Sequence, residues 1–129
     1  MSNINILLID DSQFIHDSFD AFFRKDDHVK ITATLDGTKA RELATSVKPD
    51  IIFLDYILVG TDGLTVLKEL KKDVACRDIP VIMISGKENA YDAELALMHG
   101  ACQFVHKPLS GKNIRSIVMS TCEGSENVA

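Results

Sequence analysis

The chain has 129 residues, of which 46% are apolar, and its formal net charge is −5. This length suits one domain, and the apolar fraction supports a sizeable core and excludes a disordered chain. The acidic balance argues against a direct nucleic-acid binder, which is normally basic.

From the sequence we expect neither a membrane-spanning segment nor a signal peptide. Its longest apolar runs, such as 6–9 and 51–54, hold about four residues, whereas a membrane-spanning helix needs about 20. The N-terminus lacks the charged and apolar regions of a signal peptide. The cysteines, at 76, 102 and 122, are widely spaced and odd in number, which argues against a disulfide framework. We therefore expect a cytoplasmic protein without a membrane partner, with Cys102 as a small buried residue.

Strand-like and helix-like segments alternate along the whole chain. Short apolar or alternating runs predict strands over 4–9, 29–34, 50–54, 79–84 and 102–106. Apolar residues at helical spacing predict helices over 12–25, 38–48, 62–74, 88–99 and 110–122. Five such units, (βα)5, predict an α/β fold whose parallel sheet is covered by helices on both faces. The predicted domain covers 1–122, and 123–129 is predicted as a polar, non-helical tail.

The burial expected of each strand suggests the strand order. The first, third and fourth strands are continuously apolar, whereas the second alternates and the fifth is mixed. Strands buried on both faces have continuous apolar runs, so the second and fifth strands belong at the edges. Order 2-1-3-4-5, a doubly wound flavodoxin-like sheet, satisfies this with right-handed crossovers.

Polar residues collect where the predicted strands end. Asp10 and Asp11 follow the first strand, and Asp55, Ser85 and Lys107 lie at the ends of the third, fourth and fifth. The carboxyl ends of parallel strands form one edge of a sheet, and ligands bind there where the strand order reverses. We therefore expect these side chains to form one site.

Three neighbouring carboxylates require a proton or a cation. A divalent ion with oxygen ligands is the natural solution, and Mg²⁺ suits one or two carboxylates with phosphate oxygens. With Lys107 and Ser85 around Asp55, the set predicts a site for a phosphoryl group on that residue. The plainer readings are helix-capping acids at 10 and 11, a solvated loop acid at 55 and an ordinary hydroxyl at 85. Each is reasonable alone, but the combination weighs against them. The four histidines are scattered, which favours surface or structural roles.

With these residues, the chain resembles a response-regulator receiver domain (CheY-like), the phosphoacceptor module of two-component signalling. The motifs that carry the resemblance fall in order at 7–12 (LLIDDS), 51–56 (IIFLDY), 61–63 (TDG), 84–86 (ISG) and 106–108 (HKP). Together they cover essentially the whole chain. The sequence departs from many receivers at Ile57, which is apolar, at Val59, where proline is common, and at Lys87, which is basic.

The resemblance implies a role for each site residue. Asp55 would take a phosphoryl group from the phosphohistidine of a sensor histidine kinase or a phosphotransfer protein. Asp10, Asp11 and Asp55 would hold Mg²⁺, Asp11 more directly than Asp10, together with the backbone carbonyl of Ile57, and Mn²⁺ could substitute. The other implied roles are a phosphoryl contact for Lys107, a switch hydroxyl for Ser85, a switch aromatic for Phe104 and a cis bond between Lys107 and Pro108.

The resemblance also implies a non-enzymatic signalling protein that catalyses only its own phosphorylation and dephosphorylation. Its unknown output partner would bind the face formed by the fourth helix, fifth strand and fifth helix, and the domain would be a monomer or weak dimer. One alternative is an aspartyl-nucleophile phosphohydrolase, which needs a second acid where Ile57 stands. The others are an interaction module that never carries phosphate, and a nucleotide binder, for which the first strand lacks a Gly-rich loop.

Overall fold

The structure is a computed structural model and describes residues 3–86 and 89–126. Its strands are β1 (Ile4–Ile9), β2 (Val29–Thr34), β3 (Ile51–Asp55), β4 (Val81–Ser85) and β5 (Gln103–His106). Its helices are α1 (Gln13–Phe22), α2 (Ala40–Val47), α3 (Gly63–Lys72), α4 (Ala90–Met98) and α5 (Gly111–Glu126), with a short 3-10 turn, η1 (Gly37–Lys39), before α2.

The five strands form one parallel sheet in the order β2-β1-β3-β4-β5, as the sequence predicted. The register aligns Ile9 with Leu54, and Ser85 with His106. The carboxyl ends of the central strands therefore lie side by side, and the residues that follow them share one edge of the sheet.

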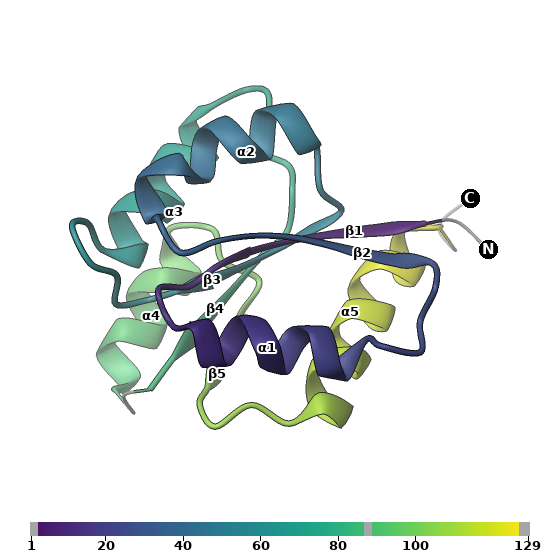
Figure 1. The fold of residues 1–129 in the computed structure, drawn as a ribbon. Coiled ribbons are helices and arrows are strands. Elements are labelled where there is room, and N and C mark those ends of the chain that lie inside the picture. The colour runs from purple at the N-terminus through teal and green to yellow at the C-terminus, as the bar shows by residue number, and fades with distance from the viewer. Residues whose placement is uncertain (1–2, 87–88, 127–129) are drawn as a thin grey trace.

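The helices cover the sheet on both faces (Figure 1), with α1 and α5 on one face and α2, α3 and α4 on the other. Each face has its own apolar cluster. Phe19 of α1 packs edge-on against Phe53 of β3 beneath α1 and α5, with ring centroids 5.0 Å apart. Leu54, Leu67 and Met83 belong to the cluster beneath α2, α3 and α4. Strands β3 and β4 are buried along their whole length. This packing makes the edge that carries the polar residues a rigid support.

Some predictions differ from the structure. The helix predicted over 38–48 begins as η1, because Asp36 accepts the Thr38 N–H and starts the tighter turn. The last helix continues to Glu126, so a non-helical tail from residue 123 is wrong for 123–126, and 127–129 lie outside the described residues. The apolar pattern stops near 122, but hydrogen bonding continues through Gly124, since a single glycine only weakens a helix. Lys87 also lies outside the described residues.

The sequence predicted Cys102 as buried, but it is exposed, because it lies just before the edge strand β5. Within residues 3–86 and 89–126, no helix is long and apolar enough to cross a membrane.

Candidate functional site

The strand ends bring the predicted acids together. Asp10 follows β1, and Asp55 is the last residue of β3, with exposures of only 0% and 4%. Asp11 is half-buried. One carboxylate oxygen from each of the three lies within 4.8 Å of the others. The structure therefore forms the acidic cluster that the sequence predicted.

Lys107 follows β5 and reaches across to this cluster. Its Nζ lies 3.1 Å from Asp10 Oδ2 and 3.3 Å from Asp55 Oδ2. Burial opposes the charged ammonium, but attraction by the two carboxylates outweighs it and raises the pKa of Lys107. The lysine therefore remains a cation. The Lys107–Pro108 bond is cis, as the resemblance implied.

Burial and charge repulsion also change the acid at the centre of the site. Burial, and then the negative charge of Asp10, raise the pKa of Asp55 from 3.8 to about 6, against the opposing effect of Lys107. The backbone N–H of Ile57 donates to Asp55 Oδ1 at 3.3 Å. At neutral pH Asp55 is ionised at a cost, and a cation beside it would relieve that cost.

This cost predicts a pH-dependent stability difference. Because the pKa of Asp55 is higher in the folded chain than its ordinary value, the folded state favours the protonated form. The contribution of Asp55 to the free energy of unfolding is therefore fully present below pH 3.8 and is lost as the pH rises through about 6. Each pKa unit corresponds to about 1.4 kcal/mol, so ionised Asp55 lowers the free energy of unfolding by about 2–3 kcal/mol at pH 8. Without metal, Asp55→Asn should be more stable than the parent by about that amount at pH 8, and the difference should vanish near pH 4.

Urea unfolding in a chelator at both pH values measures this difference. Asp78→Asn, at an exposed acid in the connection between α3 and β4, is the matched control and should match the parent at both pH values. An Asp55→Asn variant no more stable than the parent at pH 8 would contradict the prediction.

The donor set fits a divalent cation. Asp10 Oδ1 accepts the Ser12 N–H at 2.9 Å, whereas its buried Oδ2 accepts no hydrogen bond of good geometry, although Lys107 lies near it. In the part of the chain that the structure describes, the Asp11 carboxylate has no hydrogen bond or ion pair. Hard oxygen donors of this kind suit Mg²⁺. The three acids and the backbone of residue 57 are the groups that could hold it.

The loop after Asp55 depends on Gly63, which appeared in the sequence analysis only as part of the motif at 61–63. The Gly63 N–H donates to the Tyr56 carbonyl at 2.8 Å, so the chain folds back onto the end of β3. A Cβ on Gly63 would meet the Asp55 carbonyl oxygen and lie 2.7 Å from Tyr56 Cα. Only glycine allows this approach. Asp62 caps α3 through the Thr65 N–H, as expected of a helix start.

The two predicted switch residues lie on neighbouring strands. Ser85, which is 2% exposed, is in register with His106, and Met83 is in register with Phe104. The half-buried Phe104 ring packs against the cluster beneath α2, α3 and α4. Strand alternation puts Ser85 and Phe104 on the same face of the sheet.

Phe104 also has a neighbour that sequence reasoning missed. Its ring centroid lies 5.7 Å from that of Tyr56, the residue directly after Asp55. The Tyr56 hydroxyl donates to Asp92 Oδ1 of α4 at 3.2 Å. The residue directly after β3 is thus tied to α4 by a side-chain contact. No periodicity could signal a pair so distant in sequence.

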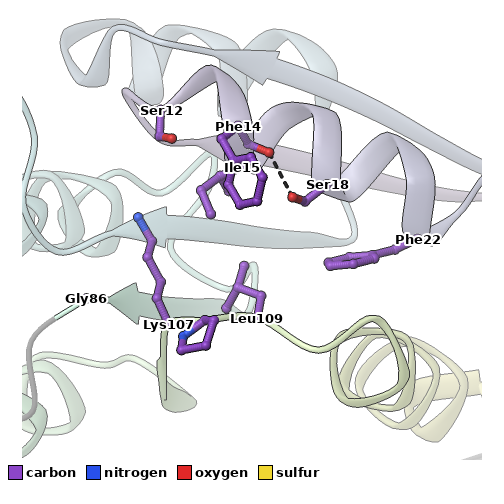
Figure 2. A pocket seen from close by; sticks show the side chains of 9 residues that line it. Ser12, Phe14, Ile15, Ser18, Phe22, Gly86, Lys107 and Leu109 are labelled. Carbon is purple, nitrogen blue, oxygen red and sulfur yellow. Dashed lines mark hydrogen bonds between the residues drawn. The ribbon is translucent and has the colours of Figure 1, made fainter.

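A groove of about 570 Å³ borders the site (Figure 2). One wall is α1 along its length as far as Phe22, and the other is the connection from β5 to α5, which includes Lys107 and Leu109. Phe14 lines the groove and is 75% exposed.

Comparison with known proteins agrees with this fold. Residues 6–119 match the family model of the response regulator receiver domain. The chain therefore belongs to the response-regulator receiver family.

Individual relatives show how much of the chain this similarity covers. The chain is 32% identical to the alkaline phosphatase synthesis transcriptional regulatory protein PhoP of Bacillus subtilis, over 98% of the chain and 52% of that protein. It thus spans about half the length of that relative. The receiver domain of a sensor histidine kinase from Pseudomonas aeruginosa, solved with magnesium in its active site cleft, has a TM-score of 0.83 at 23% identity, covering 95% of this chain and 99% of that one. A receiver domain protein from Methanospirillum hungatei has a TM-score of 0.88 at 17% identity, covering 99% and 100%.

Proposed function

We propose that this receiver domain accepts a phosphoryl group onto Asp55, in a Mg²⁺-dependent reaction, from the phosphohistidine of a sensor histidine kinase or phosphotransfer protein. The observation that carries the proposal is one cation, Lys107, bridging two buried acids that share a site with a third. The magnesium in the P. aeruginosa receiver supports the choice of metal. Mn²⁺, also an oxygen-seeking ion, is proposed as a substitute.

Each residue has a chemical role in this proposal. A carboxylate oxygen of Asp55 attacks phosphorus, a new P–O bond forms, and the P–N bond to the donor histidine breaks. Lys107 Nζ, already beside Asp55, stabilises negative charge on the phosphoryl oxygens. Asp10, Asp11 and the Ile57 carbonyl would hold the metal, which supplies further positive charge when bound. Residue 57 is not an acid, which disfavours a phosphohydrolase.

The surfaces around the site suggest where partners bind. For the phosphoryl donor we propose the groove that Lys107 lines, where exposed Phe14 offers an apolar contact. For output we propose the face formed by α4, β5 and α5. Helix α4 carries three exposed large apolar residues, Tyr91, Leu97 and Met98. The proposed output is a protein interaction in the cytoplasm, and the acidic charge of this chain disfavours direct nucleic-acid binding.

The direct test is intact-mass measurement after incubation with acetyl phosphate and Mg²⁺. We expect the chain to gain a single phosphoryl group, and a chelator to prevent the gain, because the acids then lack their cation. A chain that stays unmodified with Mg²⁺ present would contradict the proposed function.

The proposed switch makes a separate prediction. Phosphoryl oxygens on Asp55 would attract the Ser85 hydroxyl by about 1–2 Å, and Phe104 would fill the space vacated. The Ser85→Ala variant should still accept a phosphoryl group, but Phe104 and α4 should no longer respond to it. The response is measured by the change in NMR chemical shifts at Phe104 and α4 when beryllofluoride, a phosphate mimic, is added. Ser46→Ala, at an exposed serine of α2, is the control and should keep the parent's shifts. If Ser85→Ala shows the same shift changes as the parent, the Ser85 hydroxyl does not link Asp55 to Phe104, and the proposed switch is wrong.

A further inference from the structure

A buried histidine contacts the backbone of Asp10, one of the three acids of the cluster. His16 lies in the first turn of α1, and its Nε2 is 2.7 Å from the backbone carbonyl oxygen of Asp10. A carbonyl oxygen only accepts hydrogen bonds, so Nε2 carries the proton and donates it. The bond connects the helix back to the end of β1.

The Asp10 carbonyl has lost the partners that a sheet would provide. The pairing of β1 with β3 ends at Ile9 and Leu54. On the side of β2 the Asp10 N–H still donates to the Thr34 carbonyl at 3.2 Å. The next donor along that strand, the Asp36 N–H, bonds to the Thr34 hydroxyl and not to the Asp10 carbonyl. Within residues 3–86 and 89–126 no backbone N–H donates to the Asp10 carbonyl. A buried carbonyl without a partner is unfavourable, and the imidazole provides one.

This carbonyl belongs to the peptide group that joins Asp10 to Asp11. The group is planar, so holding its oxygen also fixes its N–H and the Cα of Asp11. The same short loop is tied by the Ser12 N–H, which donates to Asp10 Oδ1, and by the His16 N–H, which donates to the Ser12 carbonyl at 3.3 Å. His16 thus holds the loop by both its backbone and its side chain. This loop carries two of the three acids of the cluster.

We infer that His16 is a positioning residue for the metal site, whose imidazole holds the Asp10–Asp11 peptide so that both carboxylates are already aimed at a divalent cation. The inference rests on the Mg²⁺ requirement in the proposed function. Groups that hold metal ligands in place commonly change metal affinity 10–100-fold, and His16, which acts through the backbone, should lie near the lower end, at about tenfold.

Two substitutions separate the donor from the volume of the side chain. His16→Leu fills similar space without a donor. His16→Gln places an amide nitrogen as many bonds from Cα as Nε2 and can donate to the same carbonyl. Calorimetric titration of the metal-free chains with Mg²⁺ should show the Kd raised about tenfold in His16→Leu and less than about threefold in His16→Gln.

Phosphoryl uptake gives a second readout. Uptake from acetyl phosphate by His16→Leu should need more Mg²⁺ for half-maximal rate, yet reach within about twofold of the parent's rate at saturating Mg²⁺. Val118→Ala is the matched control, because Val118 is fully buried in α5 and outside the acidic loop. It should lower thermal stability and leave the Kd for Mg²⁺ unchanged.

The outcomes distinguish this inference from the proposed function. If His16→Leu loses stability as Val118→Ala does but keeps the parent's Kd, His16 is only structural and the inference fails. If His16→Leu does not fold, the glutamine variant decides, since a tenfold loss of affinity there overturns the donor role. A parent chain that binds no Mg²⁺ would overturn the metal-dependent function, and with it the inference.

Discussion

Asp55→Asn should reduce phosphoryl uptake from acetyl phosphate from a single group per chain to none. The carboxylate of Asp55 is the nucleophile in the proposed reaction, and a neutral amide is not a nucleophile under these conditions. The substitution keeps the size of the side chain, so the buried end of β3 and its contact with Lys107 need little rearrangement. Intact mass after incubation with Mg²⁺ measures the effect directly.

A matched control separates the site from acidic residues in general. Asp78→Asn changes an exposed acid in the connection between α3 and β4, at the opposite edge of the sheet, and should label as the parent does. Undiminished labelling of the Asp55→Asn variant would move the modification to another residue and remove the central element of the proposed function.

The sequence predicted the sheet well because burial decides it. Strands β1, β3 and β4 are apolar on both faces and are central in the structure, whereas β2 alternates and lies at an edge. Helix limits were predicted less well, because local hydrogen bonds set them. Asp36 begins a 3-10 turn before α2, and α5 continues past the last apolar position. Neither depends on the periodicity that revealed the helices.

The same contrast holds at the site. The acids and Lys107 were predictable because each lies at or just after the end of a strand, and the fold brings strand ends together. The contacts of His16 with the Asp10 carbonyl and of Tyr56 with Asp92 were missed, because they depend on the reach and direction of single side chains. Gly63 carried a visible signal, a glycine directly after a capping Asp, but the close approach to Asp55 exists only in three dimensions.

Asp11→Ala and Lys107→Ala should change Mg²⁺ affinity in opposite directions. The Asp11 carboxylate has no other partner in the described part of the chain, whereas Asp10 is engaged by the Ser12 N–H and by Lys107. Removing Asp11 therefore removes the more direct ligand. Its loss should raise the Kd roughly a hundredfold, equivalent to about 2.7 kcal/mol, and the loss of Asp10 should raise it by about tenfold.

Lys107→Ala removes a cation that lies 3.1 Å from Asp10 and 3.3 Å from Asp55. The two carboxylates then repel each other without relief and attract a divalent ion more strongly, so the Kd should fall by about threefold to tenfold. Calorimetric titration at one ionic strength compares the three variants with the parent. Equal affinity in all of them would show that the cation does not bind among these acids. A higher Kd in Lys107→Ala would mean that the lysine supports the metal site and does not compete with the metal for the same oxygens.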